Sequence, residues 1–348
     1  MHQIPLPVTR ISSSVIQSGK TKHTLVFSVS SCLWGLLCFA VFLITVVCNG
    51  AESMNLPGYP DISTFTPDLF PPAMTREAPA AGKRVRATLP AYRATEVHYS
   101  LYLPSDWQSG ARYPVIVEYA GNGGYRNKYG DVCTGCVEDC SLGFGLSGGR
   151  GFVWICLPYV DVANGANAIH WWGEVAATVA FCKEAVRTVC AEFGGDPAAV
   201  FLCGFSRGAI ACNYIGLHDD EIAGLWRGFF VASHYDGPRK WPYEDSDPAS
   251  ARVLLERLGR RPVFVSQEVT GVDPGTYTIV DTINYLAATG RPLDNFRFQI
   301  VPVRNHTDRW VLYDLPARQN LRRWLREALA APKESPGQKL SEKPPSSR

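Results

Sequence analysis

Short apolar runs alternate with amphipathic segments through the middle of this chain, and this alternation constrains the fold more than any other feature. The runs are typical of buried strands, whereas the segments between them have helical periodicity. Because strands buried on both faces need helices to cover them, the pattern predicts an α/β fold, with a mostly parallel central sheet and helices on both faces. The strands are expected at 97–103, 114–119, 152–157, 200–203, 229–232, 263–266 and 296–303, and the helices at 173–193, 207–217, 248–258, 277–289 and 315–331.

The ends of the chain differ from its middle in composition. Residues 25–47 contain no charged residue and follow two lysines, which predicts a signal peptide or a signal anchor. We therefore expect a secreted or periplasmic protein or, as the alternative, one anchored in the membrane through residues 25–47. The predicted divisions are the signal segment at 1–51, a Pro-rich lead-in at 52–85, one α/β domain at 86–331 and a disordered tail at 332–348.

The charge balance excludes one class of function. The chain has 34 Lys and Arg residues against 32 Asp and Glu residues, so its net charge is only +2. A nucleic-acid-binding protein would have a concentrated basic face, and we therefore expect no nucleic-acid partner.

The chain has 11 cysteines, of which those at 32, 38 and 48 lie in or beside the apolar segment. In an exported protein the even number of the others permits disulfides, and one is expected in the cluster Cys133-x2-Cys136-x3-Cys140. Cys203 and Cys212, which flank the pentapeptide at 204–208, are expected to be small core residues. Free thiols and a metal site are the alternatives for this cluster. No nearby His or Cys supplies the fourth ligand that a structural zinc site usually needs, so we expect no metal.

The pentapeptide Gly204-Phe205-Ser206-Arg207-Gly208 follows a predicted strand and precedes a predicted helix. G-x-S-x-G in this context is typical of a nucleophile elbow, a turn too tight for a Cβ at either glycine. Such a turn would hold the Ser206 hydroxyl above the sheet, beside a positive helix N-terminus. The alternative is an ordinary β–α turn that uses glycines.

A serine nucleophile needs a general base, and chain order favours His306. The histidine comes last in the triad order Ser, Asp or Glu, His, and His306 follows the last predicted strand on a polar loop. His234 and His170 are the alternative bases, and a plain surface-loop histidine is the non-functional interpretation.

The triad acid should follow the strand at 263–266 and precede His306. Both Glu268 and Asp273 meet this condition. We favour Asp273 because it lies in the turn-forming sequence VDPG, where a carboxylate can face the cleft, and Glu268 is the alternative.

The oxyanion of a tetrahedral intermediate needs N–H donors. One is the backbone N–H of Arg207, directly after the nucleophile. The second is expected from Gly121, Asn122 or Gly123, because this loop follows the strand at 114–119 and its glycines leave the amides unobstructed.

Aromatic and histidine side chains follow several predicted strands and could line a substrate cleft. Such rings can stack on sugar rings or phenolic acyl groups, or they can belong to the core. The candidates are His170, Trp171, Trp172, His234 and Tyr235.

With these motifs the sequence resembles the α/β-hydrolases, most of all secreted esterases of the feruloyl esterase and poly(3-hydroxybutyrate) depolymerase type. The resemblance spans residues 86–331 and is carried by GNGG at 121–124, GFSRG at 204–208, VDPG at 272–275 and NHTD at 305–308. It implies one domain, no cofactor, and hydrolysis of carboxylic esters through an acyl-enzyme with a Ser–Asp–His triad. The implied partner is a small-molecule or polysaccharide-linked ester, with a membrane as partner only if the N-terminal segment is uncleaved.

Two other functional classes stay open. A secreted serine peptidase of the prolyl-oligopeptidase type shares this fold and triad order, but such enzymes usually add a large N-terminal β-propeller, for which residues 1–85 are too few. A non-catalytic binding module on the same fold would lack a triad member, yet Ser206 and His306 are both present with acids between them.

Overall fold

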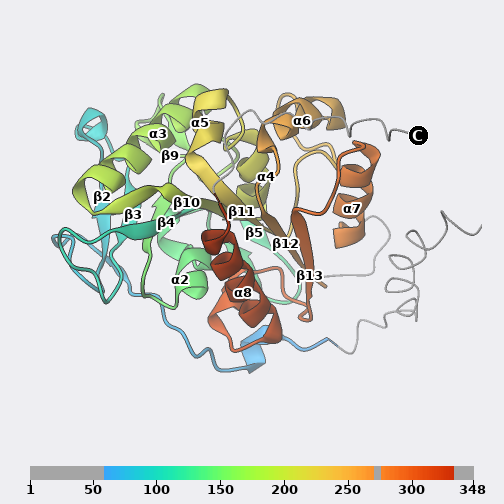
Figure 1. The fold of residues 1–348 in the computed structure, drawn as a ribbon, viewed down its shortest axis with the longest axis horizontal. Helices are drawn as coiled ribbons and strands as arrows, with labels where there is room; N and C mark the ends of the chain where they lie inside the picture. Colours follow the sequence, from blue (N-terminus) through green and yellow to red (C-terminus); the bar gives the residue numbers. More distant parts are fainter. Residues whose placement is uncertain (1–58, 270–275, 333–348) are drawn as a thin grey trace, which may run out of the picture. The chain divides into compact units, whose positions relative to one another are not determined.

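A nine-stranded sheet runs through the computed structural model of the chain, which describes residues 59–269 and 276–332 (Figure 1). The strand order is β1-β2-β3-β7-β4-β10-β11-β12-β13, and neighbouring strands are parallel except in the pairs β2–β3 and β3–β7. The strands are β1 Met74–Thr75, β2 Arg84–Ala87, β3 Tyr99–Tyr102, β4 Tyr113–Tyr119, β7 Val153–Leu157, β10 Gly195–Phe205, β11 Trp226–Ala232, β12 Val263–Glu268 and β13 Phe296–Val301. Two ribbons stand apart from this sheet, β5 Tyr125–Arg126 with β6 Val132–Cys133 and β8 Val160–Asp161 with β9 Ala166–Asn167.

Helices cover both faces of the sheet, and strand residues alternate between two cores. In β10, Val200 and Leu202 pack into the core that includes α3 and α4, whereas Phe201 and Cys203 pack into the core that includes α2 and α8. This period of two confirms the predicted fold class, a mostly parallel sheet covered on both faces. The helices are α2 Leu142–Ser147, α3 Val175–Glu192, α4 Arg207–Tyr214, α5 Asp220–Leu225, α6 Pro248–Leu255, α7 Ile279–Ala288 and α8 Pro316–Ala330, with 3₁₀ turns η2 Ile62–Thr64, η3 Pro90–Tyr92, η4 Val137–Asp139, η5 Glu256–Leu258 and η6 Asp308–Leu312.

The predicted strands and helices are present with ends that differ by a few residues. The sequence does not predict β1, β2, α5 or α2. This helix contains Gly143 and Gly145, and glycine is a poor helix former. Packing requires both glycines, because a Cβ on either would lie 2.1 Å from a side-chain atom, of Trp154 or of Val311 respectively.

The described residues of the Pro-rich lead-in, 59–85, pack against the domain. Ile62 is buried, and its N–H donates to Asn305 Oδ1 at 2.7 Å. Both Asp68 carboxylate oxygens accept from the buried Arg318 guanidinium at 2.7 Å. The strands β1 and β2 extend the sheet beyond β3. An extended Pro-rich segment is therefore held along the surface of the domain.

Two compact units divide the chain, at 1–54 and 55–348, and the first lies outside the described residues. The interpretations of residues 1–51 as a signal segment and of the tail from 333 as disordered therefore stay predictions. Between 59 and 269 and between 276 and 332, no helix is both long and apolar enough to cross a membrane.

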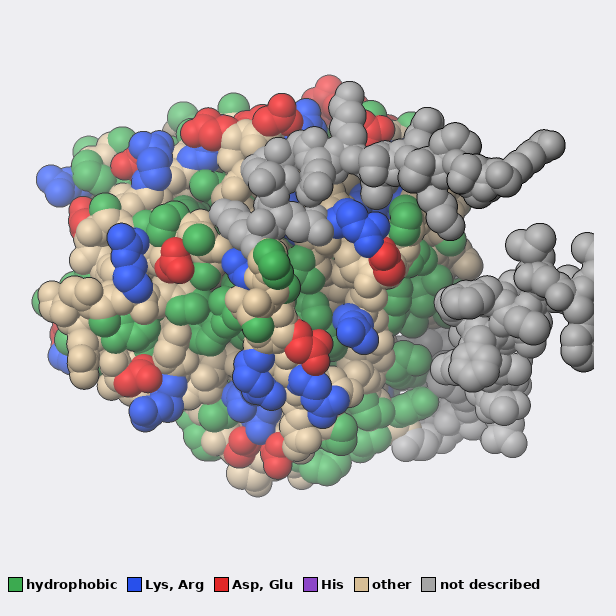
Figure 2. All heavy atoms as spheres, in the orientation of Figure 1, with side chains coloured by type: hydrophobic (Ala, Val, Ile, Leu, Met, Phe, Trp, Pro, Cys, Tyr) green, Lys and Arg blue, Asp and Glu red, His purple; other side chains and the backbone are tan. Residues whose placement is uncertain are grey.

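Acidic and basic side chains are interspersed on the face that carries α8 (Figure 2). Ion pairs on this helix include Arg318 with Asp68, and Arg297 with Glu327 at 3.9 Å. The visible face therefore has no extended patch of a single sign.

We expect a chain that begins at Gly82 to be less stable than one that begins at Tyr59. Burial of Ile62 alone contributes about 1.5–3 kcal/mol, which corresponds to a melting temperature lower by about 3–5 °C for a domain of this size. Loss of Asp68 also removes a carboxylate from the buried Arg318. Thermal unfolding followed by circular dichroism compares the two chains, and equal melting temperatures would show that the lead-in adds no stability.

Candidate active site

Ser206 lies on the turn between β10 and α4, where its backbone is strained. Its φ of 53° and ψ of −111° lie outside the regions that L-residues usually occupy. A Cβ on Gly204 would lie 2.1 Å from the Gly208 oxygen, and a Cβ on Gly208 would lie 1.9 Å from the Tyr119 oxygen. Both positions therefore require glycine, and the turn raises Ser206 at the carboxyl ends of the parallel strands.

His306 and Glu268 meet Ser206 at this edge of the sheet. The Ser206 Oγ lies 3.2 Å from His306 Nε2, and His306 Nδ1 is hydrogen-bonded to Glu268 Oε1. The His306 ring also contacts Tyr125 and Phe205, at centroid distances of 4.9 and 4.7 Å. A hydroxyl, an imidazole and a carboxylate connected in this order can activate a serine as a nucleophile.

The acid in this series of hydrogen bonds is Glu268, the alternative of the sequence analysis. Glu268 ends β12, is 3% exposed, and accepts a second hydrogen bond from Ser233 Oγ. Asp273, the favoured candidate, lies outside the described residues. Because His306 Nδ1 carries at most one hydrogen, its bond to Glu268 favours this glutamate over any other carboxylate.

Residues far away in the sequence fix the loop that carries His306. Asp131 accepts hydrogen bonds from the His306 backbone N–H and from the Asn305 side-chain amide, both at 2.8 Å. Asn305 Oδ1 in turn accepts from the Ile62 N–H, so the lead-in also holds this loop. Asn305 is 2% exposed, which makes its amide inaccessible to glycosylation despite the N-x-T sequon that begins there.

The candidate oxyanion donors divide into occupied and available amides. The Gly123 N–H donates to the Ile169 oxygen at 2.7 Å, so Gly123 is not available to a substrate, contrary to the prediction. In the described part of the chain, the backbone N–H groups of Gly121, Asn122 and Arg207 have no protein acceptor. These three amides remain the candidates, and that of Arg207 opens the helix behind the nucleophile.

The two alternative bases lie outside this series of hydrogen bonds. His170 is exposed on the loop after β9. His234 lies beside the triad, with its ring centroid 5.4 Å from that of His306, and its buried Nδ1 has no hydrogen-bond partner among the described residues. Burial holds the pKa of His234 well below its usual range, with further contributions from His306 and Arg239, so the ring is neutral at neutral pH.

Two of the other predicted lining residues belong to the core. Trp172 and Tyr235 are each 4% exposed, and Trp172 stacks on Tyr214 with centroids 5.1 Å apart. Trp171 is half-buried, and its backbone N–H donates to Asn122 Oδ1 at 2.9 Å. Its carbonyl accepts from the Arg207 guanidinium at 2.7 Å, so the Arg207 side chain fixes this loop from inside the protein.

The predicted disulfides are absent from the described residues, because all eight cysteines there are free thiols. The alternative of free thiols therefore holds for Cys133, Cys136 and Cys140. Within the same residues, no group of three or more His, Cys, Asp or Glu side chains is placed to hold a metal ion. Burial raises the pKa of Cys133 to about 11, so its thiol stays protonated at neutral pH.

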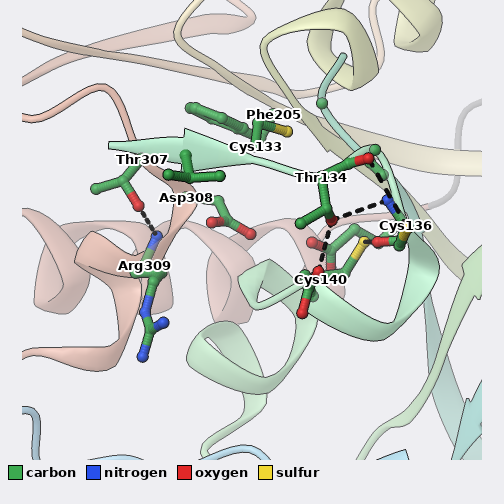
Figure 3. A pocket seen from close by; sticks show the side chains of 14 residues that line it. Cys133, Thr134, Cys136, Cys140, Phe205, Thr307, Asp308 and Arg309 are labelled. Carbon is green, nitrogen blue, oxygen red and sulfur yellow. Dashed lines mark hydrogen bonds between the residues drawn. The ribbon is translucent and has the colours of Figure 1, made fainter. Parts of the chain in front are cut away.

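A pocket of about 250 Å³ is lined by chain neighbours of the reacting groups, though by none of Ser206, His306 and Glu268 (Figure 3). The neighbours are Gly121 of the oxyanion loop, Phe205 and Thr307, while Cys136 and Cys140 lie on the side opposite Thr307. A cavity of about 150 Å³ can hold benzene, so this pocket has room for a larger group.

The strand order and the strained turn after β10 identify the architecture. The chain has the α/β-hydrolase fold. No protein-family model matches the chain, and no curated protein sequence matches it.

Solved structures to which the chain is similar include two esterases and an isopeptidase. Against the Bacillus cereus carboxylesterase the identity is 14% and the TM-score 0.41, covering 67% of this chain and 94% of that one. Against the feruloyl esterase module from Clostridium thermocellum complexed with sinapinate the identity is 12% and the TM-score 0.43, covering 77% of this chain and 94% of that one. Against the AtxE2 isopeptidase the identity is 15% and the TM-score 0.46, covering 72% of this chain and 41% of that one. The chain thus spans less than half of the isopeptidase's length, and similarities at this level say nothing about substrate.

Sequence reasoning misses the residues that support the triad. Ser233 holds Glu268, and its position directly after β11 is a signal that could have pointed to it, because strand ends at this edge carry the site. Asp131 gives no such signal, since its partners Asn305 and His306 lie 174 and 175 residues away in the chain.

We expect Glu268→Gln to lower kcat by about 10³–10⁴, because a neutral amide does not stabilise the imidazolium and permits the wrong tautomer of His306. Asp273→Asn is the matched control and should lower kcat by less than tenfold. Hydrolysis of p-nitrophenyl acetate at pH 8 measures both, with circular dichroism to confirm folding. The reverse ranking would assign the triad acid to Asp273.

Proposed function

We propose that this protein is a serine hydrolase that cleaves carboxylic esters through an acyl-enzyme. The observation that supports this function best is the continuous series of hydrogen bonds from Ser206 Oγ through His306 to Glu268, at a turn whose strain exposes the serine. A solvated surface serine needs neither the strained turn nor a buried carboxylate behind its histidine.

In the first half of the proposed reaction, Ser206 Oγ attacks the ester carbonyl carbon while its proton passes to His306 Nε2. The 3.2 Å distance between these atoms is within reach for this transfer. Glu268 stabilises the imidazolium, and the Arg207 amide, with that of Gly121 or Asn122, receives the oxyanion. The tetrahedral intermediate collapses, and the alcohol leaves with the proton from His306.

In the second half, water attacks the acyl-enzyme carbonyl and gives its proton to His306 Nε2. Collapse of the second tetrahedral intermediate breaks the bond to Ser206 Oγ, which takes the proton back. The carboxylic acid leaves, and the enzyme returns to its starting state. Every step uses side chains of this chain and water, so the proposal needs no cofactor.

The finer assignment, an exported esterase of the feruloyl esterase or poly(3-hydroxybutyrate) depolymerase type, is also a proposal. It is supported by the apolar segment at 25–47 and by the motifs at 121–124 and 204–208. The free thiols of the described residues supply no support for an oxidising compartment.

Ser206→Ala should lower esterase kcat by about 10⁴–10⁶ and abolish labelling by a fluorophosphonate probe. Ser105→Ala, which changes an exposed serine, is the matched control and should keep both the esterase activity and the labelling. Intact-mass analysis after probe treatment and the hydrolysis of p-nitrophenyl acetate are the readouts. Equal labelling and activity in the folded Ser206→Ala protein would exclude Ser206 as the nucleophile.

A further inference from the structure

Three carboxyl groups line the pocket, and two of them accept hydrogen bonds from side chains. Glu118 is 1% exposed and accepts hydrogen bonds from three successive backbone N–H groups at the start of α2 and from the Trp154 indole. Asp139 accepts from Thr134 Oγ1 at 2.5 Å. No side chain that lines the pocket donates a hydrogen bond to Asp308 (Figure 3), which accepts from the backbone N–H groups of Ser141 and of Asp308 itself. Because a carboxylate can accept about four hydrogen bonds, Asp308 keeps acceptor capacity for a ligand.

The charges around Asp308 favour a positively charged ligand. Burial and then repulsion from Glu118 raise the pKa of Asp308 to about 7, while the Arg309 charge and the backbone N–H groups of Ser141 and Asp308 itself act in the opposite direction. The Arg309 side chain points away from the cysteine-bearing side of the pocket (Figure 3). A cation that binds between Glu118 and Asp308 would relieve their repulsion.

The remaining walls suit a group with apolar surface around its charge. Phe205 and Val132 contribute hydrocarbon, and the face of an aromatic ring attracts alkylammonium cations. The thiols of Cys133 and Cys140 also face the pocket, and their raised pKa values keep them uncharged at neutral pH. The Arg207 guanidinium is bound to the Trp171 carbonyl and to the ring of Tyr159, 4.0 Å from its centroid.

We propose that this pocket binds an alkylammonium group of the substrate, with Asp308 as its counter-ion, so that the preferred substrates are esters that carry a positive charge. The inference rests on the proposed function, because the pocket matters for catalysis only if the substrate reacts at Ser206. Two residues that line the pocket connect it to the site: Gly121 belongs to the oxyanion loop, and the Phe205 ring contacts that of His306 at a centroid distance of 4.7 Å.

The test compares kcat/KM for pairs of esters that differ only in charge. One pair places the charge on the acyl group, with p-nitrophenyl 4-(trimethylammonio)butyrate against p-nitrophenyl 5,5-dimethylhexanoate. The other places it on the alcohol, with butyrylcholine against 3,3-dimethylbutyl butyrate. At pH 8 we expect a preference of about tenfold or more for the cation in one pair, which identifies the half of the substrate that enters the pocket.

Asp308→Asn should reduce that preference by about tenfold. The matched control is Asp294→Asn, which removes the same charge next to the amino end of β13, the opposite edge of the sheet, and should leave the ratio within about twofold because solvent and salt screen a distant charge.

The wild-type pH profile gives a readout that needs no variant. Asp308 is ionised above its pKa of about 7 and protonated below it. The ratio of kcat/KM between charged and neutral esters should therefore fall as the pH is lowered from 8 to 6. Any effect of pH on the reaction at Ser206 that is common to both esters of a pair cancels in the ratio.

Equal rates within both pairs, or a preference that survives Asp308→Asn and shows no pH dependence, would overturn the cation site. If the neutral esters are still hydrolysed and Ser206 is still labelled by a fluorophosphonate, the proposed function stands without it. If Ser206 is not labelled and no ester is cleaved, the proposed function itself fails.

Discussion

The contact of two glycines with backbone oxygens is the constraint on which the site depends. Gly204 and Gly208 let β10, α4 and the end of β4 approach more closely than any side chain would permit. In this close approach Ser206 has a positive φ. The strain of this conformation is offset by the packing of a core in which the central strands are buried on both faces. A hydroxyl held in this way needs little reorganisation before it reacts.

The imidazole is positioned by tertiary contacts rather than by its own segment. His306 lies in a loop after β13, yet Asp131, Glu268 and the neighbouring Asn305 fix its backbone and ring. Through Asn305 this network reaches Ile62 in the Pro-rich lead-in. The lead-in therefore belongs to the support of the site, although it contributes no side chain to the series of hydrogen bonds from Ser206 to Glu268.

Local patterns predict the fold class and the position of Ser206, because strand periodicity and the glycine spacing of the turn are encoded in neighbouring residues. His306 could be selected from chain order alone. The choice between Glu268 and Asp273 could not be made in this way, since it depends on how far β12 continues before its loop begins. Packing of the lead-in, the Asp131 contacts and the occupied amide of Gly123 depend on residues distant in the sequence. The cysteine spacing suggested disulfides, whereas the eight described cysteines are free thiols, five of them buried in the core as small apolar side chains.

The central claim is that Ser206, His306 and Glu268 act together on an acyl group. A crystal structure of the protein after reaction with a p-nitrophenyl alkylphosphonate tests it most directly, because the phosphonate mimics the tetrahedral intermediate. The account predicts phosphorus bonded to Ser206 Oγ, a phosphoryl oxygen on the amide of Arg207 and on that of Gly121 or Asn122, and His306 still bonded to Glu268. An adduct on another residue, or a His306 imidazole bonded to a different carboxylate, would contradict it.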